Sequence, residues 1–91
     1  MDKNELKMQI RKVIELLEEL LKENPDKPIL KTLHDRYKDA DLILSNDLDM
    51  KRIMIKGGCR AYLDAFSDYM NPVLVEMDKA EKILRELSTQ I

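Results

Sequence analysis

Residues 4–23 read NELKMQIRKVIELLEELLKE, and the spacing of the apolar side chains in this stretch determines the fold class. They recur every three or four residues, which places them on one face of an α-helix. These residues are Leu6, Ile10, Val13, Leu17 and Leu20. The next five residues are NPDKP, and Pro25 disfavours helical geometry at Asn24. We therefore predict a helix over 4–23 that ends before Pro25.

Two later segments have the same helical spacing. In 28–44 the stripe is Ile29, Leu33, Tyr37, Ala40 and Leu44, and in 72–90 it is Val73, Met77, Ala80, Leu84 and Leu87. Pro28 fits the first turn of a helix, where its missing N–H costs no intrahelical hydrogen bond. Asn46 lies in a break in the pattern and is predicted to be the N-cap of the following helix. We predict helices over 28–44 and 72–90.

The segment 48–70 is predicted to form one continuous helix. Its apolar residues stay in helical phase on both sides of Gly57-Gly58, although each glycine costs about 1 kcal/mol relative to alanine inside a helix. This stripe is Ile55, Cys59, Tyr62, Phe66 and Tyr69. The alternative is a β-hairpin that turns at the two glycines, but an isolated hairpin is only marginally stable and has no third strand to join.

Pro72 decides between two architectures. Asn71-Pro72 is typical of a helix start, with asparagine as N-cap and proline at the first helical position. A break near Met70–Asn71 gives an all-α antiparallel four-helix bundle, which we favour, in a single domain over 1–91. The alternative is three helices, with the last one long, kinked at Pro72 and paired with a second chain. Apolar residues off the main stripes also favour homodimerisation of the predicted bundle. They are Met8, Leu16, Leu42, Met50 and Ile53.

Composition excludes several classes of protein. The 91 residues are 44% hydrophobic and 37% charged, which argues against disorder, and no apolar run is long enough for a membrane span. The 16 basic and 18 acidic residues give a net charge of −2, which argues against a generally basic nucleic-acid-binding protein. Cys59 is the only cysteine, so no internal disulfide forms. The first residues do not resemble a signal peptide, and we expect a cytoplasmic, bacterial-type protein.

The sequence predicts that the protein is not an enzyme. His34 is the only histidine, and it is expected at the boundary of a helix, half packed and half in water. No His or Cys residues have the spacing of metal ligands, and Gly57-Gly58 lacks the Lys-Ser/Thr that follows the glycine of a phosphate-binding loop. Cys59 lies on an apolar stripe and is expected in the core. We therefore expect no catalytic residues, metal, cofactor or small-molecule substrate.

Three features of 51–69 predict where a partner would bind. Arg52, Lys56 and Arg60 are spaced to share one side of a continuous helix, and no acidic residue lies between Met50 and Leu63. The interpretation as a plain solvated face stays open for them. Gly57, Ala61 and Ala65 form a row of small residues that permits close helix packing. Tyr62, Phe66 and Tyr69 serve either the core or an interface. The predicted partner-binding residues are Arg52, Lys56, Arg60, Tyr62, Phe66 and Tyr69.

Together these observations favour a small helical module that binds a protein partner or a second copy of itself, such as an adaptor, an immunity-type protein or a chaperone-like binder. The alternative is a nucleic-acid-associated helical protein that uses the basic segment 51–60. The net charge makes this alternative the less favoured one, because phosphate contacts require a concentration of cations.

Overall fold

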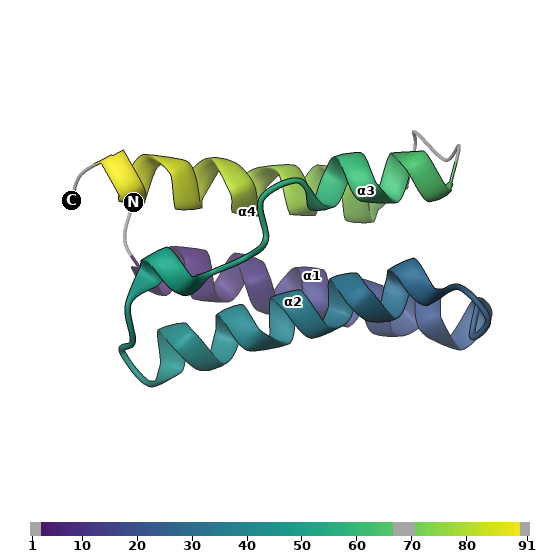
Figure 1. The fold of residues 1–91 in the computed structure, drawn as a ribbon, viewed down its shortest axis with the longest axis horizontal. Coiled ribbons are helices and arrows are strands. Elements are labelled where there is room, and N and C mark those ends of the chain that lie inside the picture. The colour runs from purple at the N-terminus through teal and green to yellow at the C-terminus, as the bar shows by residue number, and fades with distance from the viewer. Residues whose placement is uncertain (1–2, 67–70, 90–91) are drawn as a thin grey trace.

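The computed structural model describes residues 3–66 and 71–89, and within these ranges the chain is all-helical, as predicted. Figure 1 shows α1 and α2 side by side in one layer, with α3 and α4 in a second layer that covers them. The helices are α1 (Lys3–Glu23), α2 (Pro28–Ser45), the short 3₁₀ helix η1 (Met50–Arg52), α3 (Gly58–Ala65) and α4 (Pro72–Thr89). α1 packs against α2 and α4, and α3 packs against the same two helices, which fits a four-helix bundle.

The ends of the long helices follow from proline and asparagine, as predicted. α1 ends at Glu23, before Pro25, and Pro28 is the first residue of α2. Pro72 begins α4, and the Asn71 side-chain oxygen accepts a hydrogen bond from the Val73 N–H at 2.9 Å. This bond satisfies a donor that the first turn of a helix leaves unpaired. The chain therefore breaks before Pro72, and the long kinked helix is not formed.

Asn46 corrects one prediction about helix ends. It is the C-cap of α2 and not an N-cap, because its backbone N–H and its side-chain amide both donate to the Leu42 carbonyl, at 3.0 and 2.9 Å. These bonds satisfy a carbonyl in the last turn of α2. Asp49 caps the next element instead, since its carboxylate accepts the Lys51 N–H at 3.0 Å where η1 begins.

The predicted continuous helix over 48–70 is wrong. Within the described part of this segment, η1 is followed by non-helical residues 53–57, and α3 begins only at Gly58. Gly57 has φ +85°, a left-handed conformation that breaks a right-handed helix and favours glycine. The hairpin is absent too, because no strand occurs in the described ranges. Residues 67–70, with Tyr69, lie outside the described residues.

The extended residues before Gly57 are buried in alternation. Ile53 and Ile55 are buried, whereas Met54 between them is 67% exposed. This two-residue period is that of an extended chain, whose successive side chains point to opposite sides. Ile53 therefore belongs to the core and not to a surplus apolar surface. Of the other residues in that prediction, Met8 and Leu42 are exposed, Leu16 is half-buried, and the side chain of Met50 lies outside the description.

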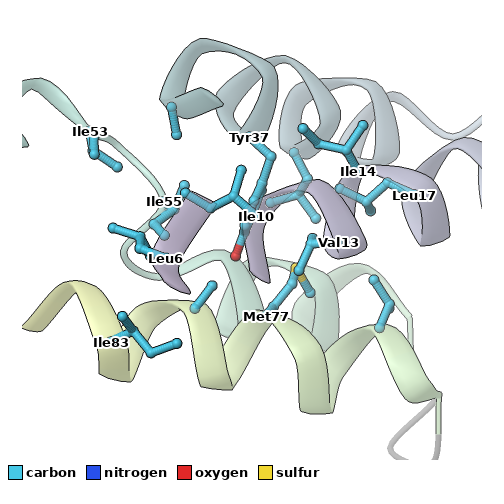
Figure 2. Packing of buried hydrophobic residues seen from close by; sticks show 14 of the residues in the cluster. Leu6, Ile10, Val13, Ile14, Leu17, Tyr37, Ile53, Ile55, Met77 and Ile83 are labelled. Atoms are coloured by element: carbon cyan, nitrogen blue, oxygen red, sulfur yellow. The ribbon is translucent and has the colours of Figure 1, made fainter. Parts of the chain in front are cut away.

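The core lies between the helices and includes side chains from every α-helix and from the extended residues (Figure 2). The largest fully buried side chains include Tyr37 of α2 and Tyr62 of α3. Gly58 is the glycine at a close approach, because a Cβ there would lie 3.5 Å from the Leu33 side chain and 3.7 Å from Met77 Sδ. The predicted row that starts at Gly57 does not make this approach, since nothing lies within 4 Å of a Cβ at Gly57.

Candidate functional site

The predicted basic residues are all exposed, but they do not share one helix face. Arg52 ends η1, Lys56 lies in the turn before Gly57, and Arg60 is in the first turn of α3. The helical spacing that grouped them fails because the helix is interrupted at Gly57. These three residues, together with Lys51, are called the cationic segment below. None of the four makes an ion pair within the described residues.

The predicted aromatic residues divide between core and surface. Tyr62 is 1% exposed and belongs to the core. Phe66 is half-buried and stacks on Tyr62, with the ring centroids 4.8 Å apart. Lys27, from the α1–α2 connection, places its Nζ 5.7 Å from the centroid of Phe66, within the range of a cation–π contact. Only Phe66 of the described pair therefore presents part of its ring to the outside.

Glu81 of α4 holds the start of α3. Its carboxylate accepts the Gly57 N–H at 2.8 Å and the Cys59 N–H at 3.4 Å. The first turn of a helix has unpaired N–H groups and the positive end of the helix dipole, so it favours a negative group. This contact has no signal in the sequence, because Glu81 lies 24 residues from Gly57 and no local pattern links them.

A shallow hollow lies beside this contact. It is lined by Lys56, Glu81, Leu84, Arg85 and Ser88 and has a volume of about 190 Å³. Pockets for drug-sized ligands and cofactors are roughly 300–1,000 Å³. The hollow therefore has room for one side chain or a small ion, with two cations and a hydroxyl on its walls.

Two titratable groups lie on the core side of the same turn. Burial, followed by the hydrogen bond and negative charge of the neighbouring Glu81 carboxylate, raises the pKa of the Cys59 thiol to about 12. The thiol is therefore protonated at neutral pH, and it donates to the Leu74 carbonyl at 3.6 Å. Burial also raises the pKa of Tyr37, and the negative charge of Glu81 adds to this effect. Cys59 is thus a partly buried thiol packed against the core, close to where the sequence predicted it.

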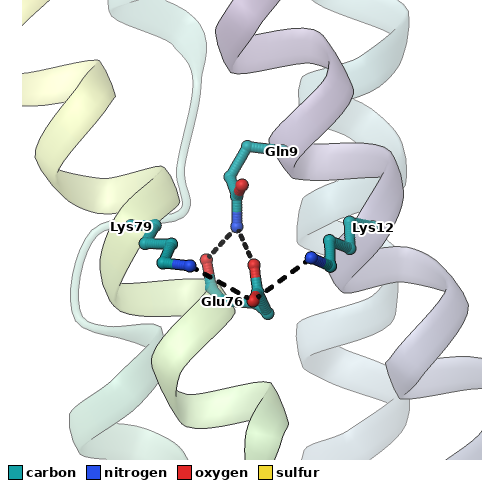
Figure 3. Close-up of polar contacts among 4 residues, drawn as sticks. All are labelled: Gln9, Lys12, Glu76 and Lys79. Carbon is teal, nitrogen blue, oxygen red and sulfur yellow. Dashed lines mark hydrogen bonds and ion pairs between the residues drawn. The ribbon is translucent and has the colours of Figure 1, made fainter.

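A second polar cluster joins α1 to α4 on another face (Figure 3). The Gln9 side-chain amide donates to the Glu76 backbone carbonyl at 2.8 Å and to its carboxylate at 2.6 Å. Lys12 and Lys79 approach the same carboxylate at 3.4 and 3.5 Å. The hydrogen bond from Gln9, followed by the positive charges of the two lysines, lowers the pKa of Glu76. Because its charge is satisfied within the bundle, this buried carboxylate serves the fold.

His34 lies where the sequence predicted, at the edge of the α1–α2 contact. Its Nε2 is 3.2 Å from a carboxylate oxygen of Glu18, and its side chain is 17% exposed. The ring therefore connects two helices and lies outside the hollow. Across residues 3–66 and 71–89 no group of three or more His, Cys, Asp or Glu side chains is arranged to hold a metal ion. In the same ranges no helix has the length and apolar character to cross a membrane.

Comparison with known proteins identifies the family. The family model described as "YeeD uncharacterised protein" matches residues 1–91. The chain belongs to the YeeD family. One relative in this family is "Uncharacterized protein YeeD" of Bacillus subtilis strain 168, which is 37% identical over 92 residues, covering 92% of this chain and 90% of the relative. No solved structure matches the chain.

Proposed function

We propose that the chain is a non-enzymatic, cytoplasmic interaction module that binds an acidic segment of a protein partner through the cationic segment. The observation that carries this proposal is that Lys51, Arg52, Lys56 and Arg60 are exposed, make no ion pair within the described residues and have no acidic residue between them in the sequence. Several cations elsewhere are already paired across or along helices, such as Arg11 with Asp41 at 3.0 Å and Lys82 with Asp78 at 2.9 Å.

The engagement of the reactive side chains supports a non-enzymatic role. The Cys59 thiol is protonated and packed, and His34 lies against Glu18 between two helices. An active site needs several such groups to converge on one pocket. The hollow instead combines the cations Lys56 and Arg85 with one carboxylate, Glu81, and this excess of positive charge suits recognition of an acidic side chain.

The test compares two sets of charge reversals. Arg52→Glu, Lys56→Glu and Arg60→Glu together change the cationic segment, whereas the control set Lys22→Glu, Lys31→Glu and Lys38→Glu changes exposed lysines of α1 and α2. Affinity capture from the native host, quantified by mass spectrometry, should identify a protein that the wild type and the control retain and the first set loses. Circular dichroism should show unchanged helix content in both sets. Identical captured proteins for all three would contradict the proposal.

The same variants test the nucleic-acid alternative. Phosphate contacts give an affinity that falls steeply as salt increases. If the wild type binds duplex DNA at micromolar concentration with such a salt dependence, and the first set abolishes it, the nucleic-acid role replaces the protein partner. Homodimerisation stays a prediction, which sedimentation equilibrium checks: a species with the mass of one chain excludes it.

A further inference from the structure

Residues 53–55, which join η1 to the turn before α3, resemble a single β-strand. Ile53 and Ile55 are buried and Met54 is 67% exposed, so successive side chains alternate between the core and solvent. Figure 1 shows that the chain crosses here from the layer of α1 and α2 to the layer of α3 and α4. Because both isoleucines pack in the core, the stretch is already ordered, and a partner that binds beside it loses little affinity to ordering it.

The main chain of Met54 is free to pair with another chain. Within the described ranges neither its N–H nor its C=O takes part in a hydrogen bond, whereas Arg52 N–H donates to the Asp49 carbonyl at 3.0 Å and Gly58 N–H donates to the Ile55 carbonyl at 3.1 Å. Buried main-chain groups are nearly always paired, so the unpaired groups of Met54 belong at the surface, where water can bond them. In an antiparallel pair one residue exchanges two hydrogen bonds with the residue opposite, so Met54 offers both a donor and an acceptor to an added strand.

The charges around Met54 select the sequence of such a strand. Arg52 and Lys56 stand at the two ends of 53–55, are exposed and make no ion pair in the part of the chain that the structure describes. A strand beside 53–55 extends past both ends of the stretch, where the two cations favour acidic side chains and oppose basic ones. An apolar residue opposite Met54 would cover its exposed side chain.

We propose that the acidic segment of the partner binds as an extended strand beside residues 53–55 and exchanges two main-chain hydrogen bonds with Met54. This inference rests on the proposed function and adds the conformation of the bound segment and its pattern, an apolar residue with an acidic residue two positions before and after it. Addition of a strand to an open main-chain edge is a recurring way to bind peptides. Since 53–55 offers one hydrogen-bonded pair, the ion pairs with Arg52 and Lys56 supply a comparable share of the affinity.

The first experiment titrates the peptide Glu-Thr-Leu-Thr-Glu, blocked at both ends, and follows the amide NMR signal of Met54 at constant ionic strength. An N-methyl group on the leucine removes the donor that faces the Met54 carbonyl, so we expect binding about tenfold weaker. The matched control has its N-methyl group on the second threonine, whose N–H points away from Met54 in this pairing, and it should bind as the unmodified peptide does. Replacing both glutamates by glutamine should also weaken binding.

The second experiment changes the protein. Met54→Pro removes the main-chain donor and is compatible with an extended backbone, whereas Met54→Ala removes the same side chain and keeps the donor. We expect Met54→Pro to bind the peptide about tenfold more weakly than Met54→Ala does. Fluorescence anisotropy of the labelled peptide measures both variants, and circular dichroism should show the same helix content. If Met54→Pro loses helix content, the two N-methylated peptides decide the question on the wild type.

Two results would overturn the strand pairing. One is equal binding of the unmodified peptide and both N-methylated peptides, because charge alone would then attract the segment. The other is a Met54 amide signal that moves with none of the peptides. Neither result contradicts the proposed function, which fails separately if reversing the charges of the cationic segment leaves the captured proteins unchanged.

Discussion

The three long helices and the connecting segment, residues 46–66, are held in place by different means. α1, α2 and α4 each bury a continuous apolar face, and side-chain contacts such as Gln9 with Glu76 join them. The connecting segment contains only one turn of 3₁₀ helix and the eight residues of α3, and Glu81 of α4 satisfies the start of α3. Helical spacing therefore determines structure where helices are long and a proline marks one of their ends. Helical spacing does not determine structure where a glycine such as Gly57 can adopt a left-handed backbone conformation.

The largest expected effect tests whether the connecting segment belongs to the same core as the long helices. Ile55 is 0% exposed, so Ile55→Ala should lower the free energy of unfolding by about 2–5 kcal/mol, as for a buried residue of a long helix. Met54→Ala should change it by less than about 0.5 kcal/mol, because Met54 points to solvent. Urea denaturation followed by circular dichroism measures both. Similar losses at the two positions would contradict the alternating burial.

A smaller effect distinguishes the two glycines. Gly57→Ala should destabilise the protein by about 1–2 kcal/mol, because alanine is strained in the left-handed conformation that Gly57 adopts. Gly58→Ala should stabilise it by about 0.4–1 kcal/mol, since the new methyl group makes ordinary van der Waals contacts in a helix. Thermal denaturation of both variants checks the signs. A continuous helix would instead predict stabilisation at both positions, so a gain at Gly57 would restore that interpretation.

The smallest expected effect is a pH dependence in the long helices. The folded pKa of Glu76 is lowered from its ordinary value of 4.5, so the ionised group stabilises the fold above that pH. The stabilisation is lost as pH falls through the lowered folded pKa. The wild type should therefore lose stability on acidification that Glu76→Gln does not lose. Denaturation from pH 7 to pH 3 measures the difference, and Glu15→Gln, an exposed carboxylate of α1, serves as the control. Parallel curves for the wild type and Glu76→Gln would contradict this role of Glu76.

The sequence predicted the long helices because their signals are local. Pro25, Pro28 and Pro72 stand within or beside the helix ends that they determine, and each apolar stripe repeats over about four turns. The prediction for the connecting segment was wrong because the same apolar residues also fit a second arrangement. In it, burial alternates before Gly57-Gly58 and follows helical spacing after them. Ile55 and Tyr62 are both buried, as the helical stripe required, but they reach the core from different backbone conformations.

The candidate site was only partly predictable for a related reason. The cationic residues were visible in the sequence, and their exposure agrees with the prediction. Their grouping on one helix face was wrong, and Arg85 and Glu81 were missed as neighbours of Lys56. That proximity arises from the packing of α3 on α4, which no spacing within 48–70 encodes.

The contact between Glu81 and the start of α3 also has a consequence for the order in which the chain folds. Isolated helices shorter than about 12–15 residues are marginal in water, and α3 has eight residues. The carboxylate that completes its first turn comes 24 residues after Gly57 in the chain. During synthesis, α1 and α2 can therefore pair as soon as both have emerged, because a short connection joins them. α3 gains this contact only when α4 is present, so we expect the connecting segment to become ordered together with α4 and after the pairing of α1 with α2.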